Sequence, residues 1–468
     1  MAGILACGAY IPRFRLGKET AGWGSPLEKA VANFDEDSIT MAVAAAQDCL
    51  RGLDRSQVDA LYFATTTPPY LEQQASALIA EALDLRPTVF ATDITNTLRG
   101  GTIALRAALD AVMAGSARQA LVVAADSRMS APRGEWERSL GDGAAAVLVG
   151  REGGGAEILA SHTMTEHMLD TWRTPQDLFV RSWEDRFIAE EGYQRVVPQV
   201  VSEFSQRHGV VPKDIDRVAL YAPDARRHQD MARRLGFRPE QVVDPLFGKV
   251  GNTGAAFTLL LLVSALETAK PGDRILAVGY GDGGDVFLLR ATEGVERVRS
   301  NRRLVSRHVE AKRILPTYET YARWREVWVS EAARRPPPPM PSVSALWREK
   351  EANIRFYGSR CNACGYTQYP PQRVCTKCQA VDQMTPVRLA ETYGTVFTYS
   401  MDYLAGTIDT PLVVAVVNFE GGGRWLGMMT DREISEVRIG MPVELTFRKL
   451  RTVGGVHNYY WKCMPVRA

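Results

Sequence analysis

Apolar and polar positions follow two alternating patterns along the first 295 residues. Short apolar runs predict buried strands, and longer stretches with helical periodicity lie between them. The expected strands are 60–66, 120–125, 144–150, 217–222 and 274–280, and the expected helices are 37–53, 71–84, 100–115, 190–208, 226–236 and 253–269. This succession is typical of a layered α/β domain. Its second half, residues 151–295, repeats the order of elements in its first half, residues 1–150.

The pattern changes after residue 295. Residues 296–350 are rich in Arg and aromatic side chains and contain PPPPMP at 336–341. They predict a helix followed by a polyproline-type linker, since consecutive prolines cannot continue a helix. Residues 389–468 hold Gly-bounded runs of Val, Thr, Tyr and Phe, which predict the short antiparallel strands of a small β-barrel.

Composition adds little about partners. The chain has 468 residues, of which 46% are apolar and 24% charged, as expected of a folded multidomain protein. A net charge of +2 gives no field strong enough to favour nucleic acid or a membrane surface. The sequence shows neither a signal peptide nor an apolar run of the ~20 residues that span a bilayer. We therefore expect a cytoplasmic protein with no membrane or nucleic-acid partner.

The segment 351–388 carries the clearest chemical signal. Two C-x-x-C motifs, formed by Cys361, Cys364, Cys375 and Cys378, can present four thiolates to one tetrahedral ion. Sulfur then fills every coordination position, so the sequence predicts a structural zinc rather than a catalytic one. An iron centre or a redox-active pair of motifs is the alternative.

Two stretches of the chain resemble known families. GAYIPRFRL (8–16), DEDSITMAVAAA (35–46), DGAAAVLVG (142–150) and VGNTGAAF (250–257) resemble 3-hydroxy-3-methylglutaryl-CoA synthases of the thiolase superfamily. The part after residue 295 resembles the zinc-ribbon and OB-fold proteins of the DUF35 type, which accompany thiolase-like enzymes. The resemblance implies a duplicated five-layer αβαβα fold followed by a zinc ribbon and a small OB-type barrel. It also implies a homodimer that binds a CoA thioester.

The resemblance also identifies departures at the expected active site. The nucleophilic cysteine of the family corresponds to Leu98, its acid/base glutamate to Thr66 and its histidine to Tyr221, whereas the asparagine is kept as Asn252. A leucine cannot form an acyl-enzyme. Arg99, beside Leu98, is the arginine that we favour for contact with CoA. The sequence thus predicts a site that cannot perform ordinary condensation by acyl transfer.

Two functions remain open at this stage. Tyr221, Asn252 and Thr66 still offer hydroxyl and amide groups that can polarise a thioester oxygen. The resemblance extends to thiolase-like proteins without the cysteine, which include retro-aldolases that work with ribbon and OB-fold partners. It therefore implies that the chain forms or cleaves a carbon–carbon bond in a CoA thioester, in the manner of an aldolase and within a complex. The alternative is a non-catalytic subunit that binds a CoA thioester for a separate thiolase. No displaced cysteine lies between Cys49 and Cys361, and His228 is expected to be a surface residue of an amphipathic helix.

Overall fold

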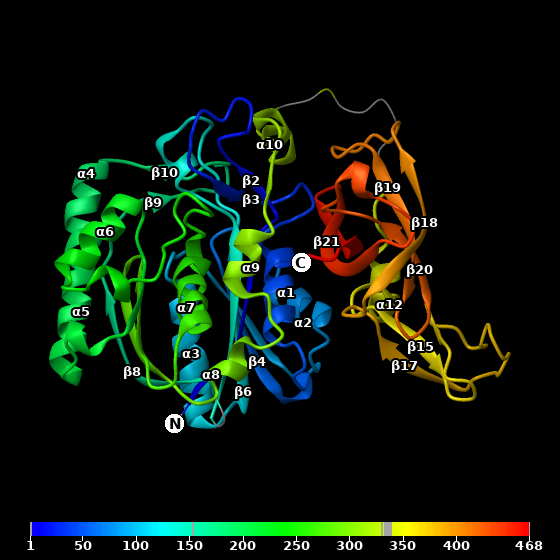
Figure 1. Cartoon of the computed structure of the whole chain (residues 1–468), viewed down its shortest axis with the longest axis horizontal. Helices are drawn as coiled ribbons and strands as arrows, with labels where there is room; N and C mark the ends of the chain where they lie inside the picture. Colours follow the sequence, from blue (N-terminus) through cyan, green and yellow to red (C-terminus); the bar gives the residue numbers. More distant parts are fainter. Residues whose placement is uncertain (1, 152–153, 329–330, 332–338, 468) are drawn as a thin grey trace. The chain divides into compact units, whose positions relative to one another are not determined.

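The computed structural model describes residues 2–151, 154–328, 331 and 339–467. They form two compact units, of which the first holds Met1–Ala32, Asp37–Ala80 and Leu85–Tyr321, and the second holds the remaining segments with Ala322–Ala468. Each unit has its own sheets (Figure 1).

The first unit is built around one mixed sheet in the order β11-β12-β13-β8-β1-β7-β6-β4-β5. The strands from the first half of the sequence are β1 (Gly3–Tyr10), β4 (Val58–Thr65), β5 (Phe90–Thr95), β6 (Gln119–Asp126) and β7 (Gly143–Gly150). Those from the second half are β8 (Ala156–Thr165), β11 (Arg217–Leu220), β12 (Arg274–Tyr280) and β13 (Gly283–Ala291). The five strands that the sequence predicts are all present.

The strand order reveals the internal duplication. The order β4-β6-β7-β1 in the first half is matched by β11-β12-β13-β8 in the second, and the two halves meet where β1 pairs with β8. In both halves the outer pair, β4–β6 and β11–β12, is parallel. The end of β4 in the first half therefore corresponds to the end of β11 in the second, and the end of β6 corresponds to the end of β12.

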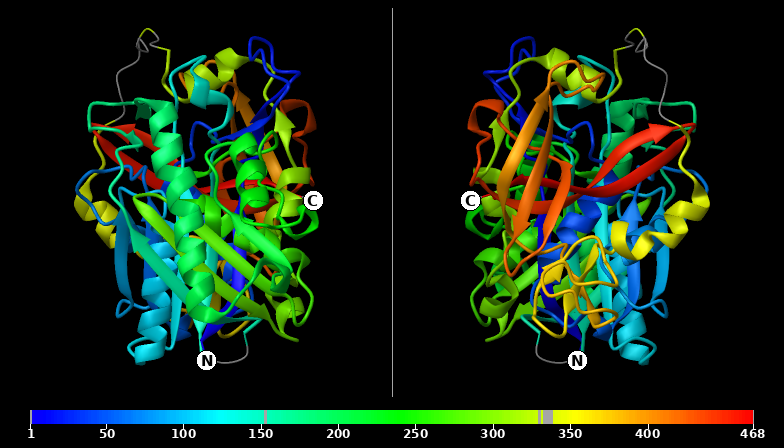
Figure 2. Two further views of the ribbon diagram at one scale, coloured as in Figure 1. Left: turned by 90° about the vertical axis from the view of Figure 1, so that its left-hand side faces the viewer. Right: turned by 90° about the vertical axis from the view of Figure 1, so that its right-hand side faces the viewer.

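Helices complete the five layers that the sequence predicts. They are α1 (Ser38–Cys49), α2 (Ala75–Ala82) and α3 (Gly100–Ala114) in the first half, and α5 (Gln194–His208), α6 (Ala225–Arg234) and α7 (Phe257–Thr268) in the second. Helices α3 and α7 pack against each other between the two parts of the sheet, α1 packs on β1 and β7, and α5 packs on β8 and β13 (Figure 2).

The apolar sequence of α7 explains why this helix lies in the centre of the first unit. α7 has the sequence FTLLLLVSALET and buries nearly all of its residues, as expected for a helix that is apolar on every side. Close approach of α3 and α7 needs glycine, because a Cβ on Gly101 would lie 2.5 Å from the Ala255 carbonyl oxygen. The start of α3 is thereby held against the start of α7.

Short elements complete the first unit. The strands are β2 (Phe14–Leu16), β3 (Lys29–Val31), β9 (Thr171–Trp172), β10 (Arg181–Ser182) and β14 (Arg313–Ile314). The helices are α4 (Asp185–Phe187), α8 (Val295–Arg299), α9 (Leu304–Glu310) and α10 (Tyr318–Trp324), the last of which crosses the boundary between the units. α10 is the helix expected within 296–350, whereas Pro336–Pro338 of the expected polyproline linker lie outside the described residues.

The second unit contains a ribbon and a barrel-like sheet. After α11 (Val343–Arg348) and α12 (Lys350–Asn353), the ribbon strands are β15 (Tyr357–Cys361), β16 (Thr367–Gln368) and β17 (Met384–Arg388). An antiparallel sheet follows in the order β20-β19-β18-β21-β22. Its strands are β18 (Gly394–Asp402), β19 (Leu412–Phe419), β20 (Arg424–Met428), β21 (Pro442–Val453) and β22 (Val456–Pro465).

Aromatic side chains form the core of this unit. Phe356 stacks on Tyr369 with ring centroids 4.6 Å apart, and it also contacts Trp425 and Trp461. Trp461 is fully buried, and its Nε1 donates a hydrogen bond to the Ile354 carbonyl. These aromatic rings pack against one another in the core.

Within the described ranges, no helix combines the length and apolar character that crossing a bilayer requires.

Candidate functional site

A cavity of about 60 Å³ lies inside the first unit, where the ends of strands from both halves meet. Leu98 contributes from the start of α3, Arg128 from the segment after β6, Tyr221 from the segment after β11, and Tyr280 from the end of β12. The other lining residues are Glu135, Trp136, Asp170, Thr171, Asp185, Ile188, Ala189, Tyr193, Pro223 and Arg227. These lining residues include no cysteine and no histidine.

Three tyrosines form the most enclosed part of the wall. The ring of Tyr221 lies 5.8 Å from that of Tyr280, and the ring of Tyr193 lies 5.4 Å from that of Tyr280. Tyr193 uses its hydroxyl to donate a 2.8 Å hydrogen bond to the Tyr221 carbonyl, which fixes the end of β11. Burial raises the pKa of Tyr221 to about 12, with Arg128 and the Asn252 amide opposing the shift. Tyr221 is therefore protonated at neutral pH and can donate a hydrogen bond.

The Tyr280 hydroxyl is enclosed but has no hydrogen bond of normal geometry with any described residue. A π-helical turn, Ile188–Tyr193, makes room for it, because a Cβ on Gly192 would lie 2.7 Å from this oxygen. Such single π-helical turns occur frequently at functional sites. Burial and the nearby Asp170 carboxylate raise the pKa of Tyr280.

Asp170 is one of three acidic residues that line the cavity, with Glu135 and Asp185. It accepts a 2.5 Å hydrogen bond from the Thr171 amide. Burial is the main cause that raises its pKa, and the proximity of Tyr280 and Arg128 partly opposes this. A carboxyl group with a raised pKa is a better proton acceptor than an ordinary one. No sequence pattern indicates Asp170 or Arg128, because neither lies in a periodic element or a recognised motif.

Leu98 lies immediately before α3, which begins at Gly100. The backbone of Gly281 lies against it, since a Cβ on Gly281 would come within 3.1 Å of the Leu98 Cβ and backbone nitrogen. An aliphatic side chain therefore occupies the position that the resemblance assigns to the nucleophile. The remaining cysteines outside the ribbon, Cys7, Cys49 and Cys463, are buried elsewhere, and burial raises the pKa of each.

Thr66 does not line the cavity, and its hydroxyl is engaged by Asp126. Asp126 is fully buried at the end of β6 and accepts hydrogen bonds from the Thr66 amide at 2.7 Å and the Thr66 hydroxyl at 2.9 Å. The hydroxyls of Thr65 and Thr67 and the Ala255 amide also donate to it. This geometry favours a structural role for Thr66, so the catalytic role expected from the sequence stays a prediction.

Asn252 and Arg99 also lie behind the cavity wall. Asn252 donates a 3.0 Å hydrogen bond to the Ala222 carbonyl and accepts one from Gly254, so it positions the segment that carries Tyr221. Arg99 is buried in an ion pair with Asp285 at 3.2 Å and donates to the Met164 carbonyl. Of the predicted catalytic residues, only Tyr221 lines the cavity. The predicted contact of Arg99 with CoA stays a prediction.

His228 corrects an expectation. It lies on α6 with only 2% of its surface exposed and belongs to the buried face formed with Met231 and Ala232. The expectation of a surface position was wrong, because His228 occupies the buried face of the amphipathic helix. Burial lowers its pKa to about 4. His228 does not line the cavity.

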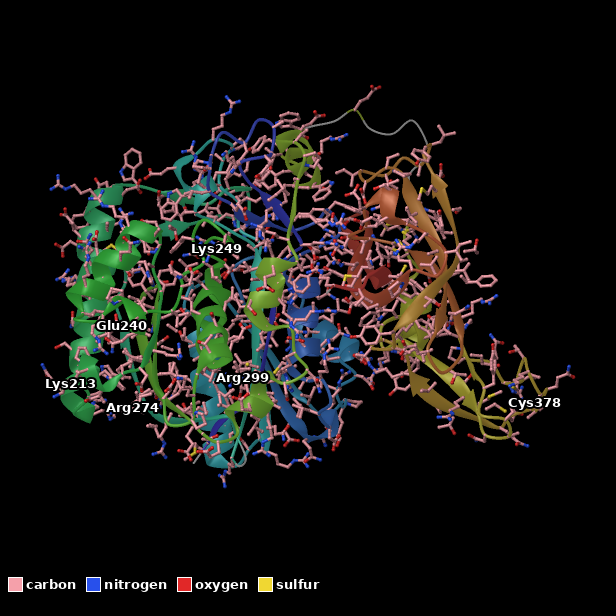
Figure 3. All side chains as sticks on the ribbon, in the orientation of Figure 1. Lys213, Glu240, Lys249, Arg274, Arg299 and Cys378 are labelled. Atoms are coloured by element: carbon pink, nitrogen blue, oxygen red, sulfur yellow. The ribbon has the colours of Figure 1, made fainter. Side chains whose placement is uncertain are left out.

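The ribbon brings the four predicted metal ligands together. The sulfur atoms of Cys361, Cys364, Cys375 and Cys378 all lie within 4.8 Å of one another, and Cys378 is labelled in Figure 3. The Cys361–Cys378 and Cys364–Cys375 sulfur pairs are each 3.6 Å apart. Tetrahedral zinc with bonds of about 2.3 Å places its sulfur ligands about 3.8 Å apart. The donor set and its geometry fit zinc, and they suggest a structural site.

Comparisons with protein families match both units. Residues 92–167 match 3-oxoacyl-[acyl-carrier-protein] synthase III, and residues 205–287 match the C-terminal part of that family. Residues 348–385 match the rubredoxin-like zinc ribbon domain of ChsH2, and residues 387–448 match its C-terminal OB-fold domain. These matches confirm the expected succession of a thiolase-like fold, a zinc ribbon and an OB-fold.

Relatives match about two thirds of this chain over nearly their own full length. The chain is 31% identical to the hydroxymethylglutaryl-CoA synthase of Methanopyrus kandleri over 69% of its own length and 97% of that protein. It is 33% identical to that of Aeropyrum pernix over 69% and 94% of the two chains. Among solved structures, an HMG-CoA synthase complexed with CoA shares the fold at a TM-score of 0.62, 18% identity and coverage of 69% and 89%. The 3-oxoacyl-[acyl-carrier-protein] synthase III of Aquifex aeolicus gives 0.56, 25% identity and coverage of 62% and 100%.

Proposed function

Because the chain belongs to the hydroxymethylglutaryl-CoA synthase family, we propose that it forms or cleaves a carbon–carbon bond in an acyl-CoA by aldol chemistry, without an acyl-enzyme. The observation that carries the proposal is the lining of the cavity. Two acid/base side chains, Tyr221 and Asp170, line the same cavity as Leu98. Leu98 occupies the position at which the family resemblance requires a cysteine.

The cysteines of the first unit support a mechanism without a covalent thioester. Acyl transfer needs a thiolate. Cys7 and Cys49 do not line the cavity, and burial raises the pKa of both thiols, that of Cys49 to about 12. Neither thiol is suited to attack a thioester bound in the cavity.

In the cleavage direction, the substrate is a 3-hydroxyacyl-CoA. Asp170 accepts the proton of the 3-hydroxyl group, the C2–C3 bond breaks, and C3 leaves as the carbonyl of an aldehyde or ketone. The electron pair of the broken bond passes to C2 and the thioester as an enolate. Protonation of C2 then gives a shortened acyl-CoA. The reverse sequence forms the bond.

Tyr221 is the proton donor of this scheme. Its pKa of about 12 keeps the hydroxyl protonated at neutral pH. This protonated state suits it to hydrogen-bond the thioester oxygen and to return a proton to C2. Asn252 and Tyr193 hold the Tyr221 segment and act as positioning residues.

The test uses the purified full chain alone. It is incubated with a panel of 3-hydroxyacyl-CoA thioesters, and mass spectrometry follows the shortened acyl-CoA and the carbonyl product. Turnover that is lost in Tyr221→Phe supports the proposal. Binding of the thioesters with no turnover by the chain alone contradicts it.

The second candidate function is a non-catalytic subunit that binds a CoA thioester for a separate thiolase. It is favoured by Thr66, whose hydroxyl is already bound to Asp126 and so does not replace the family's glutamate as an acid or base. In this case the chain alone is inactive, but its addition changes the activity of a thiolase. The same assay, run with and without a thiolase, separates the two functions.

A homodimer through the first unit is part of the proposal. β5 is an edge strand of the large sheet, and its first residue, Phe90, is 59% exposed. An edge strand with an exposed aromatic residue is suited to pair with a second copy. The zinc bound by the four ribbon cysteines would have a structural role.

A further inference from the structure

Arg128 is a buried cation that has no partner in the described protein. Only 6% of its surface is exposed, it lines the cavity, and it makes no hydrogen bond or ion pair with any described residue. The neighbouring arginines differ in this respect. Arg227, in the same wall, pairs with Asp224 at 2.5 Å, and Arg99 pairs with Asp285 at 3.2 Å.

The nearest carboxylate does not neutralise Arg128. A Cβ on Gly254 would lie 2.2 Å from Asp126 Oδ2 and 2.9 Å from Arg128 Cδ, so the two side chains are close neighbours. Asp126, however, already accepts five hydrogen bonds, which uses the acceptor capacity of a carboxylate. No Arg128–Asp126 ion pair forms.

The other charges near Arg128 are of both signs, since Glu135, Asp170 and Asp185 line the same cavity as Arg227. Arg173 is a second cation in this region, and its Nη2 donates to the Thr66 carbonyl rather than to a carboxylate. Asp170 lines the same cavity, and burial disfavours the charged form of its carboxyl group. A guanidinium does not lose its proton in a protein, so Arg128 is charged whether or not a ligand is bound.

From this arrangement we infer that Arg128 binds a carboxylate carried by the acyl chain of the substrate. The inference rests on the proposed function, because it takes the cavity to hold the acyl part of a CoA thioester. A buried unpaired charge is unfavourable, and a ligand carboxylate would compensate it through two parallel hydrogen bonds. The cavity has room for about four water-sized groups, which suits a carboxylate but not the diphosphate of CoA.

The test measures binding without turnover. Isothermal titration calorimetry on the full chain compares thioesters of equal chain length that end in a carboxylate or a methyl group: succinyl- with butyryl-CoA, glutaryl- with pentanoyl-CoA, and adipyl- with hexanoyl-CoA. None carries a 3-hydroxyl group, so the aldol reaction cannot occur. We expect at least one carboxylate-bearing thioester to bind about 10- to 100-fold more tightly than its partner.

The variant Arg128→Met keeps an unbranched apolar stem and removes the charge. It should abolish this preference, whereas Arg128→Lys should keep part of it. Arg186→Met is the matched control, because Arg186 is an exposed arginine of α4 that pairs with Glu190, and this variant should keep the full preference. Equal affinities within every pair, or a preference that survives in Arg128→Met, would overturn the inference.

Two further results separate this inference from the proposed function. If none of the six thioesters binds, the proposed function fails and the inference fails with it. If all bind without discrimination, only the inference fails. The melting temperature gives an independent readout: ligand-free Arg128→Met should melt at the same or a higher temperature than the wild type, since it loses an unpaired buried charge. A lower melting temperature would indicate a structural role and contradict the inference.

Discussion

The two halves of the first unit share one order of strands and helices but differ in what they place at equivalent ends. Thr66 follows β4 in the first half, and Tyr221 follows the equivalent strand β11 in the second. Asp126 ends β6, and Tyr280 ends the equivalent strand β12. Thr66 and Asp126 are joined by hydrogen bonds. Tyr221 and Tyr280 instead line a cavity, and the Tyr280 hydroxyl has no hydrogen bond of normal geometry with a described residue.

This difference shows how a duplicated fold can divide its tasks. Asp126 accepts five hydrogen bonds, four from Thr65–Thr67 at the end of β4 and one from Ala255 in the turn before α7, which holds the first-half side of the site in place. In the second half, the enclosed Tyr280 hydroxyl has no hydrogen bond of normal geometry with a described residue, which costs stability. Unpaired polar groups retained in a buried cavity are a mark of function.

The largest expected effect distinguishes the two halves by activity. Tyr221→Phe should lower kcat/KM by about 10²- to 10³-fold, because it removes a proton donor. The equivalent variant in the first half, Thr66→Val, should change kcat/KM by less than about threefold, since its hydroxyl faces Asp126. Steady-state kinetics with a 3-hydroxyacyl-CoA gives both values. Equal losses in the two variants would remove the distinction between the halves.

Stability should show the opposite order. Asp126→Asn places an amide donor among groups that already donate, so we expect the free energy of unfolding to fall by about 3 kcal/mol. Asp170→Asn removes a carboxylate whose charged form burial disfavours, and it should change the free energy of unfolding by less than about 1 kcal/mol. Urea denaturation of the two variants measures this difference. A larger loss in Asp170→Asn would contradict the comparison.

Acid should destabilise the second half. The first 150 residues contain no histidine, whereas α6 buries His228 with its Nε2 unpaired. The pKa of His228 is about 4 in the folded chain, below the value of about 6.5 in an unfolded one. Between these values the unfolded chain binds the extra proton, so this stability is complete above about pH 6.5 and is lost as the pH falls toward 4.

The loss that His228 contributes should reach about 2 to 3 kcal/mol. It is measured as the free energy of unfolding at pH 7, 6, 5 and 4, for the wild type and for His228→Phe. The variant should lack this part of the pH dependence. An identical slope in both proteins would show that His228 is not its source.

A smaller effect tests the space around Tyr280. Gly192→Ala places a methyl group against the Tyr280 hydroxyl, and displacement of this group should lower kcat about tenfold. In a Tyr280→Phe background the oxygen is absent, so the same substitution should have little further effect. This double-mutant cycle separates a contact with the hydroxyl from a general disturbance of the π-helical turn. Additive losses would contradict the contact.

Sequence patterns predicted the scaffold better than the site. The apolar run of α7 and the two C-x-x-C motifs carry their signal in adjacent residues, so the central helix and the ribbon were predicted before any geometry was known. The family resemblance placed Leu98 and Tyr221 at the site, and both line the cavity.

Residues that depend on the fold were not predicted. Asp170 lies in an irregular segment before β9, and Arg128 lies just after β6. The role of Asp170 arises from its burial in the cavity lining, and that of Arg128 from the lack of a partner among the described residues. No local sequence pattern encodes either property. His228 was expected on the surface, because its neighbours Arg226 and Arg227 are polar. The sequence pattern of α6 does not by itself show that His228 lies on the buried face of the helix. A charged residue directly after a buried strand is the signal that could have drawn attention to Arg128.

The most direct test of the central claim is intact-protein mass spectrometry of the wild-type chain during turnover of a 3-hydroxyacyl-CoA. The account predicts that the product accumulates while the protein keeps its unmodified mass, because Leu98 offers no nucleophile. A Leu98→Cys variant, treated in the same way, provides a reference for an acyl adduct at this position. An acyl adduct on any residue of the first unit of the wild-type chain, formed and consumed at the rate of turnover, would contradict the account.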